Sequence, residues 1–393
     1  MYVTRPLSQL LKSPDILTAP PDGPNSGYMV IQDEESECYS CFGCCKKRTV
    51  KDLPVPQDKE LIVRYTQSTP GQGIDTSEDP LLLIPVLNQP LSCNRYYAIV
   101  PHGRHKGEAI TCSREEDKVT CCFCRCIKDV KRRPLDPNNI FQQIEIVPYQ
   151  SFWSTKGSFF AKSIAQDGFP PYFLKLKGWT IKTKTPSNFK LDIAKGVDSK
   201  LRARLPNFNF SISRKSCEFV VVGKWYSPFV FVKEGTVKDQ VKRSMYYELT
   251  LEQRWEQVFT CRNTTNDNRV AIDVVLEKEE VFVGGSKAVW NERSVVDGVI
   301  WFTGRGPGRG ETRVGLRVEI VERMKWEQER GGWRGGDERQ VRINRVERFK
   351  KGGGWNEFGL YVLVERFNLK RMDGSLVMSY DFKHFHQMKT KWE

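Results

Sequence analysis

The sequence predicts a mainly β protein with antiparallel, sandwich-like sheets, two packed regions and few short helices. Three observations favour this class. The 393 residues exceed the roughly 250 to 300 residues that a single hydrophobic core usually supports, so two regions are expected. Short runs rich in Val, Ile and Tyr recur along the first half and end at Pro, Gly, Asn or Asp, which is typical of strands joined by turns. Along the second half apolar and polar residues alternate, which indicates strands with one buried face.

The N-terminal part is expected to begin with an extended arm and to continue as a β domain. Residues 1–27 are predicted to form the arm, because Pro20, Pro21 and Pro24 leave no regular period there. Residues 28–165 are predicted to form an N-terminal cysteine-containing β domain, since the apolar runs are short and bounded by turn residues. The predicted strands span residues 28–32, 61–65, 81–86, 96–100, 109–112, 119–127 and 144–147.

The C-terminal part is expected to be an antiparallel β domain over residues 216–393, reached through a basic connecting segment at 166–215. Apolar residues fall on every second position in several runs, and Gly-rich stretches separate these runs. This arrangement predicts consecutive strands joined by hairpins. The clearest runs are Tyr247, Leu249, Leu251, Trp255 and Phe259, then residues 314–320, and then residues 376–382.

Two features depart from this alternation. Val237, Val241 and Met245 are four residues apart and follow Gly235, so a short helix is predicted before the first long strand. Residues 248–283 also resemble residues 319–349 faintly. Either a duplication or any antiparallel meander with charged outer faces produces such a similarity.

The chain is strongly basic, and the excess is concentrated in its middle. There are 62 Lys and Arg against 48 Asp and Glu, which gives a net charge of +14. Residues 128–215 hold 17 basic and 6 acidic residues, a net of +11. This excess favours an anionic partner, either membrane lipid or a protein, with nucleic acid as the alternative, unless the charge only aids solubility. The candidate anion-binding residues are Lys131, Arg132, Arg133, Lys182, Lys184, Lys200, Arg202 and Arg204.

The chain is expected to be cytoplasmic, or peripheral at a membrane. The first residues form no continuous apolar stretch of the kind that a signal peptide has. No stretch approaches the roughly 18 uninterrupted apolar residues of a membrane span. In a reducing compartment, the 12 cysteines are expected to be thiols, metal ligands or lipidation sites rather than disulfides.

Eight of the cysteines form two clusters that could carry chemistry. Two intervening residues between Cys38 and Cys41 suit ligands of one zinc ion, so Zn is the alternative to the expectation of no cofactor. Phe42 and the basic residues after the first cluster suit S-acylation at a membrane surface instead. Buried structural thiols are the third interpretation. The candidate metal or S-acylation residues are Cys38, Cys41, Cys44, Cys45, Cys121, Cys122, Cys124 and Cys126.

No catalytic constellation is recognisable. The sequence contains no G-x-S-x-G, H-E-x-x-H or P-loop motif. The four histidines form two pairs, His102 with His105 and His384 with His386, which leaves a metal-dependent or Cys-His enzyme as an alternative. Arg- and Gly-rich stretches at 304–310 and 330–336 are typical of hairpin loops, and a contact with RNA or DNA is their alternative. A non-enzymatic protein that acts by binding is therefore the leading hypothesis.

Several segments resemble those of a plant-specific family of uncharacterised proteins. They include the opening MYVTRPLS, GPNSGYMVIQDEE, NRYYAIV, CSREED followed by CCFCRCIKDVKRRPLDP, GKWYSPFVFVKEG and KRSMYYELTLEQRWE. The resemblance spans nearly the whole chain. Some members of the family are labelled insecticidal crystal toxin domain-containing, and the family has no established active site. The resemblance implies a plant source and a setting in stress or defence.

Overall fold

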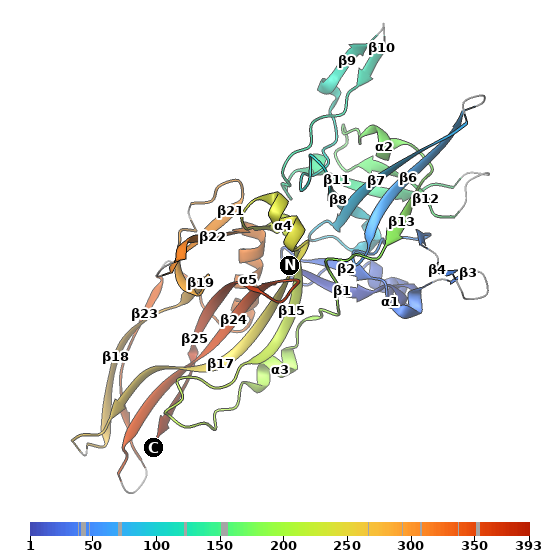
Figure 1. The fold of residues 1–393 in the computed structure, drawn as a ribbon. Helices are drawn as coiled ribbons and strands as arrows, with labels where there is room; N and C mark the ends of the chain where they lie inside the picture. The colour runs from blue at the N-terminus through green and yellow to red at the C-terminus, as the bar shows by residue number, and fades with distance from the viewer. Residues whose placement is uncertain are drawn as a thin grey trace. The chain divides into compact units, whose positions relative to one another are not determined.

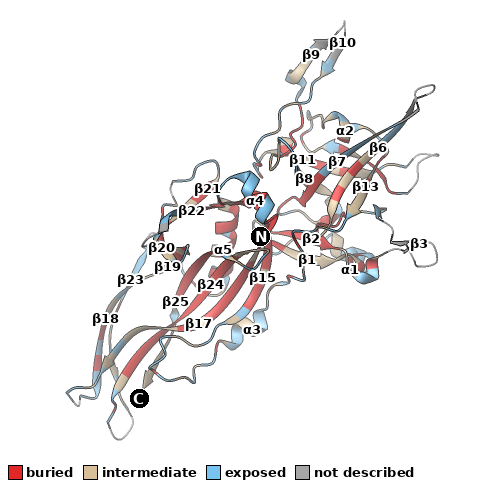
Figure 2. Cartoon of the chain, in the orientation of Figure 1, coloured by how far each residue is buried: buried red, intermediate tan, exposed pale blue. Residues whose placement is uncertain are grey.

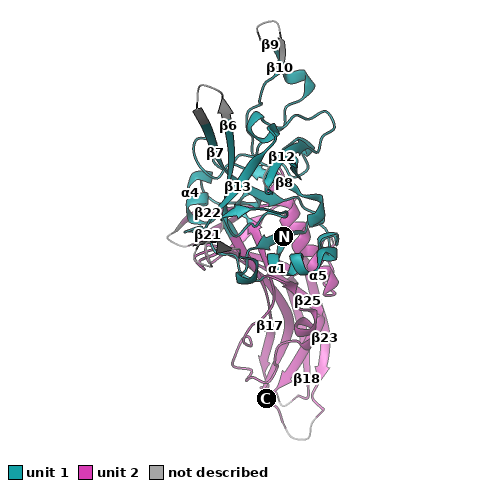
Figure 3. Cartoon of the chain, turned by 90° about the vertical axis from the view of Figure 1, so that its right-hand side faces the viewer, with its two compact units in different colours: residues 1–193, 228–246 teal, residues 194–227, 247–393 magenta. Residues whose placement is uncertain are grey.

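The computed structural model divides into two compact units, which Figure 3 shows in different colours. Unit 1 comprises residues 1–193 and 228–246, and unit 2 comprises residues 194–227 and 247–393. The segment expected to connect two domains, residues 166–215, is thus divided between the units. The structure describes all residues except 38, 41–44, 47, 70–72, 122–123, 151–155, 266, 293, 307–308, 337 and 351–353. Only the backbone is described at 39–40, 45–46, 68–69, 73–74, 120–121, 124–125 and 309.

Unit 1 is built on a sheet of seven strands in the order β12-β11-β8-β7-β6-β13-β5. Because β12 also pairs with β13, through Phe159 opposite Trp179, six of these strands form a closed ring. Closure leaves those six strands no free edge. The strands are β5 (Thr49–Val50), β6 (Glu60–Thr69), β7 (Gly73–Pro85), β8 (Arg95–Ile99), β11 (Gln143–Pro148), β12 (Ser158–Ser163) and β13 (Trp179–Lys184).

The inward side chains of this ring form the core of unit 1. In β11, Ile144 and Ile146 point inward while their neighbours are more exposed, as the period of two requires. Trp179 is fully buried, its ring lies 5.6 Å from that of Phe159, and its indole N–H donates to the Leu174 carbonyl at 2.9 Å. This partner matters, because a buried indole N–H without an acceptor is costly.

Further short elements complete unit 1 (Figure 1). Strands β1 (Tyr2–Pro6) and β2 (Gly27–Ile31) pair in parallel, and two small antiparallel pairs stand apart from the ring. Those pairs are β3 (Tyr39–Ser40) with β4 (Cys45–Lys46), and β9 (Lys118–Cys121) with β10 (Cys124–Ile127). The helices are α1 (Leu7–Lys12), α2 (Tyr172–Lys175) and α4 (Val237–Arg243); β16 (Val232–Lys233) precedes α4.

Unit 2 is built on long antiparallel strands in the order β22-β21-β20-β19-β25-β24-β17-β15, with β14 beside β15. Figure 2 shows that β17, β24 and β25 are buried along much of their length. A second pair, β18 with β23, packs its inner side chains Val270, Ile272 and Ile343 against Phe358 and Leu360 of β24. The strands are β14 (Gly196–Val197), β15 (Val220–Pro228), β17 (Tyr246–Arg262), β18 (Arg269–Glu277), β19 (Glu279–Val283), β20 (Ser286–Trp290), β21 (Val299–Gly306), β22 (Arg309–Arg317), β23 (Gln340–Arg348), β24 (Glu357–Arg371) and β25 (Leu376–Trp392).

These elements confirm the predicted class, mainly β with antiparallel sheets and few short helices. The short helix expected around Val237 and Val241 is also present as α4. In unit 2 the helices are α3 (Ser199–Arg204) and α5 (Val318–Arg330).

The extended arm expected at residues 1–27 is not what the structure contains. The chain begins with β1 and α1, and Met1 and Tyr2 are buried. The Tyr2 hydroxyl donates to the Pro85 carbonyl at 2.9 Å, and the Met1 ammonium donates to the Asn25 carbonyl at 2.6 Å. Pro and Gly do interrupt the segment, but its terminus is held by these long-range bonds, which local composition does not reveal.

The alternating strand expected over residues 314–320 ends early, because α5 begins at Val318. The helix buries Ile320 and Met324 at i and i+4, and Arg323 pairs with Glu327 at 2.9 Å. Ile320 and Met324 thus fit the spacing of a helix as well as Val318 and Ile320 fit the spacing of a strand. Burial of Ile320 and Met324 together stabilises the helix. Residues 319–327 are therefore helical while residues 248–256 lie in β17, which argues against a duplication.

Candidate functional site

Most of the predicted cysteine site lies outside what the structure describes. Cys38, Cys41, Cys44 and Cys122 are not described, and Cys45, Cys121 and Cys124 are described in their backbone alone. Cys45 lies opposite Ser40, and Cys121 opposite Cys124, so the described members of the clusters lie on the two small strand pairs of unit 1. Figure 1 draws these two pairs well separated.

The described cysteines include one exposed and one deeply buried thiol. Cys126 is exposed, whereas Cys112 is buried and burial raises the pKa of its thiol to about 11. A thiol with such a pKa is a poor nucleophile at neutral pH. Among the side chains that the structure describes, no three His, Cys, Asp or Glu residues form a metal-ligand group. Zinc binding and acylation by the clusters stay predictions.

The predicted anion-binding residues are divided between the units. Unit 1 contains the Lys131-Arg132-Arg133 run and, on β13, Lys182 and Lys184. Lys182 pairs with Glu78 at 3.1 Å, and Lys184 pairs with Glu60 at 3.5 Å. The remaining candidates, Lys200, Arg202 and Arg204, lie on α3 in unit 2.

Arg202 is not part of an exposed basic surface. Its side chain is 11% exposed and makes a two-pronged contact with Glu365, with Nε to Oε1 at 2.8 Å and Nη2 to Oε2 at 2.6 Å. It also lies 3.4 Å from a carboxylate oxygen of Glu327. The arginine neutralises two buried carboxylates of unit 2, so we assign it to stability and exclude it from the candidate surface.

The structure brings Lys184 to the rim of a cavity in unit 1, which we call the basic cavity. The cavity has a volume of about 350 Å³, within the roughly 300 to 1,000 Å³ typical of small-molecule sites. Its floor is apolar and consists of Leu61, Leu81, Leu82, Phe189, Val241 and Met245. Its polar rim consists of Lys59, Glu60, His102, Lys106, Lys184 and Lys242.

The rim carries four lysines and one glutamate, a net of three positive charges when His102 is neutral. Lys184 shares its charge with Glu60, and Lys106 donates to the Lys238 carbonyl at 3.4 Å. Among the described residues, Lys242 and His102 have no ion-pair partner, and both are exposed. The rim therefore offers cationic groups to a ligand above an apolar floor.

One carboxylate behind the rim is less acidic than usual. Asp58 pairs with Lys59 at 2.9 Å, yet burial raises the pKa of the Asp58 carboxyl. Burial exceeds the effect of the lysine because the side chain is only 11% exposed, and a buried carboxylate loses its hydration. Asp58 therefore offsets the charge of Lys59 at the rim.

Local sequence explains how α4 contributes to both floor and rim. Thr236 caps the helix by accepting from the Asp239 N–H at 3.2 Å, as Thr favours at this position. The buried Gln240 amide donates to the Val232 carbonyl at 2.7 Å and so holds the helix against β16, the strand that precedes it. Adjacent helical residues point about 100° apart, so Val241 reaches the floor while Lys242 stays at the rim.

Sequence reasoning identified few of these residues. Lys184 is among the basic candidates, and Val241 and Met245 belong to the spacing that predicts a short helix. The other rim groups come from the start of β6, from the loop after β8 and from α4. They are close because β6, β7 and β8 are neighbours in the sheet and α4 lines the same cavity, and no local signal marks them.

Comparison with known proteins gives a partial family match and a structural likeness. Residues 22–123, which lie in unit 1, match a family described as "Protein of unknown function (DUF1262)". Among solved structures, "Crystal structure of Cry35Ab1" has a TM-score of 0.46 and 11% sequence identity, and covers 86% of this chain and 90% of that chain. A search of curated proteins finds no match. In the part of the chain that is described, no helix is both long and apolar enough to cross a membrane.

Proposed function

We propose that this protein acts by binding rather than by catalysis, and that unit 1 binds an amphipathic anion in the basic cavity. The observation that supports the proposal is a cavity that combines an apolar floor with two rim lysines, Lys106 and Lys242, that have no carboxylate partner among the described residues. A fatty carboxylate or an alkyl phosphate has the matching chemistry, because its tail suits the floor and its head suits Lys242 and Lys106. Such a head group occurs both on free amphiphiles and on membrane lipids. The family resemblance supports a role in plant stress or defence.

Tail and head make separable contributions to this binding. Each buried methylene is worth about 0.8 kcal/mol, so affinity should rise about fourfold per methylene until the floor is covered. The rim charges contribute through ion pairing that salt screens, so raising the salt concentration should weaken binding. A purely hydrophobic site shows the first dependence without the second, and a merely basic surface shows the second without the first.

Isothermal titration calorimetry of the full chain with hexanoate, octanoate, decanoate and decanol tests the proposal. We expect affinity to rise along the three carboxylates, and decanol to bind more weakly than decanoate. Lys242→Gln should weaken decanoate binding about fivefold, consistent with loss of one partly exposed charge contact. The matched control is Lys238→Gln on the same helix, because Lys238 is exposed and does not line the cavity.

A second arm distinguishes the source of the ligand. Co-sedimentation with phosphatidylcholine vesicles, with and without phosphatidylserine, shows whether the same rim binds a lipid head group in a bilayer. Binding of decanoate without vesicle binding favours a free amphiphile. Equal binding of all four titrants, or none at all, refutes the proposal; binding of duplex DNA in its place favours the nucleic-acid alternative.

A further inference from the structure

The hairpin of β19 and β20 in unit 2 opens soon after its turn. Val283 pairs with Ser286 and Phe282 with Lys287, and the pairing of the two strands ends there. On its other side β20 continues to pair with β21, from Ala288 opposite Gly304 to Trp290 opposite Phe302. Among the described residues, the last three residues of β20 therefore have a strand neighbour on one side alone.

The main-chain groups of this free side point into the opening. In an antiparallel pair, successive residues direct their N–H and C=O groups to alternate sides. The Trp290 carbonyl accepts from Arg339 Nη1 at 3.4 Å, and therefore faces away from β21. Ala288, two residues earlier, has the same orientation. We call the main-chain groups of Ala288 and Trp290 on this side the open edge of β20.

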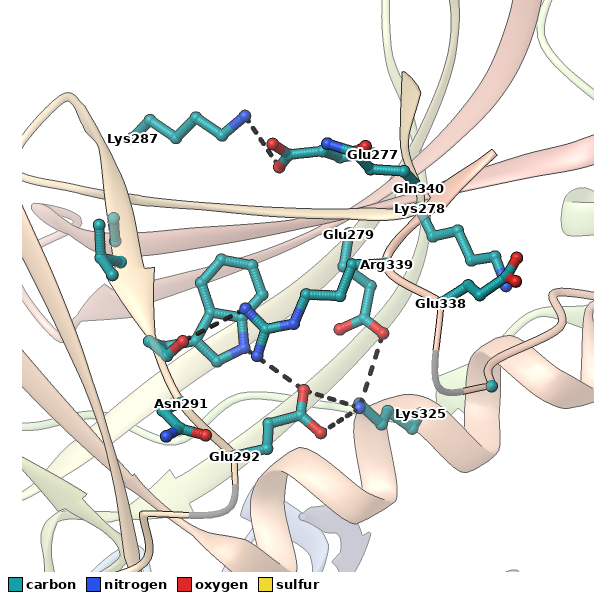
Figure 4. A pocket seen from close by; sticks show the side chains of 14 residues that line it. Glu277, Lys278, Glu279, Lys287, Asn291, Glu292, Lys325, Glu338, Arg339 and Gln340 are labelled. Atoms are coloured by element: carbon teal, nitrogen blue, oxygen red, sulfur yellow. Dashed lines mark hydrogen bonds and ion pairs between the residues drawn. The ribbon is translucent and has the colours of Figure 1, made fainter. Parts of the chain in front are cut away.

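A large hollow adjoins the open edge. It has a volume of about 1,100 Å³, and β19, β20, α5, Gly336 and residues 338–340 contribute to its lining (Figure 4). Three strand residues extend about 10 Å, so the open edge can pair with an extended segment of three or four residues. An unpaired strand edge is a ready template for another chain.

Four carboxylates and four cations line the hollow: Glu277, Glu279, Glu292 and Glu338, and Lys278, Lys287, Lys325 and Arg339. Lys287 is neutralised by Glu277 at 2.8 Å, and Lys325 by Glu292 at 2.7 Å. Arg339 has no carboxylate within ion-pair distance among the described residues, and its guanidinium lies over the Trp290 ring, 5.2 Å from the centroid. Figure 4 shows this side chain crossing the hollow beside the open edge. Guanidinium groups bind carboxylates in a two-pronged geometry.

We propose that unit 2 binds an extended acidic peptide segment, which pairs with the open edge of β20 and places a carboxylate on Arg339. The main chain of the partner pairs with Ala288 and with the N–H of Trp290, whose carbonyl already accepts from Arg339, and one acidic side chain supplies the charge. This site is separate from the basic cavity and rests on different residues, so either proposal can fail without the other.

Titration of the full chain with the peptide acetyl-SVEVES-amide, followed by tryptophan fluorescence and calorimetry, tests the site. We expect binding, with at least tenfold weaker affinity for acetyl-SVKVKS-amide. Arg339→Gln should weaken binding of the acidic peptide about tenfold, as expected for loss of a charge-assisted hydrogen bond. Arg334→Gln is the matched control, because Arg334 is also exposed but does not line the hollow.

A chemical variant of the peptide tests strand pairing without altering the protein. N-methylation of alternate peptide amides removes the donors that pair with one edge while keeping the side chains. Alternate amides can be methylated in two registers, at the odd or at the even positions of the peptide. At least a tenfold loss of affinity for one of these two methylated peptides supports the proposal. It is overturned if the wild-type chain does not bind the acidic peptide, if the basic peptide binds equally well, or if neither register of methylation changes the affinity.

Discussion

Acidification should destabilise unit 2 through a single buried histidine, His384 in β25. Its side chain is fully buried; Nε2 lies 2.8 Å from Oε1 of Gln328 and 3.7 Å from a carboxylate oxygen of Glu365. Arg202 and the ring of His386, 5.3 Å away, are the other charged or titratable neighbours. Burial lowers the pKa of His384 from 6.5 to about 4, because loss of hydration outweighs the attraction of Glu365.

The sign and size of the effect follow from that pKa. A depressed histidine pKa means that the unfolded chain binds the proton more readily, so stability is complete above pH ~6.5 and is lost as the pH falls toward ~4. With 1.36 kcal/mol per pKa unit, the free energy of unfolding should fall by about 2 kcal/mol between pH ~7 and pH ~5. The Glu365 carboxyl, whose pKa is lowered chiefly by the Arg202 hydrogen bond against the opposing effect of burial, adds its own loss at lower pH.

Urea unfolding followed by tryptophan fluorescence measures this loss, since eight of the ten tryptophans lie in unit 2. His384→Gln keeps a polar group near Gln328 but cannot titrate, so it should remove most of the pH dependence in this range. His105→Gln is the control, because the His105 side chain is 44% exposed. An unchanged pH dependence in the His384 variant, or an NMR titration that places the His384 pKa near 6.5, refutes the reasoning.

Three further predictions concern stability and thiol chemistry. Arg202→Met should cost about 3 to 5 kcal/mol in urea unfolding, since it leaves the buried Glu365 carboxylate without its arginine, whereas Arg204→Met at an exposed position should cost under about 1 kcal/mol. Phe208→Ala should lower the free energy of unfolding by about 2 to 4 kcal/mol, because the Phe208 ring packs 5.5 Å from Trp255 and 5.2 Å from Tyr361; a value near zero means that residues 205–210 act only as a linker. Alkylation of the native chain, read by mass spectrometry, should modify Cys126 well before the buried Cys112, and equal rates at the two thiols contradict the burial assigned to Cys112.

Several features of the fold could be predicted from local pattern. The period of two around Leu249 and Leu251 predicts β17 because a half-buried strand exposes one face to water wherever it lies in the fold. The spacing of Val237 and Val241 predicts α4 for the analogous helical reason. The same logic was wrong at Val318 and Ile320, because Ile320, Val321 and Met324 are three and four residues apart and form one buried face of a helix.

The roles of charged residues depended on tertiary structure. Sequence reasoning treated Arg202 and Lys184 alike, as members of one basic stretch. Arg202 pairs with Glu365, which is 163 positions away in the chain, and is buried by that pairing. Lys184 stays exposed at the rim of a cavity. Formal charge is a property of the sequence, but whether a charge is neutralised internally depends on which distant residues the fold places beside it.

The sequence by itself determined the strand-rich class, the position of α4 and the basic excess of the chain, because backbone periodicity and composition are local quantities. Only the tertiary structure decided the division into units, the basic cavity and the open edge of β20. The cavity needs β6, β7, the loop after β8 and α4 to meet around one apolar floor. The open edge needs β19 to pair along β25 while β20 pairs along β21. Both arise from contacts between distant segments. The free energy of such contacts depends on residues far apart in the chain, so it cannot be predicted from a short stretch of sequence.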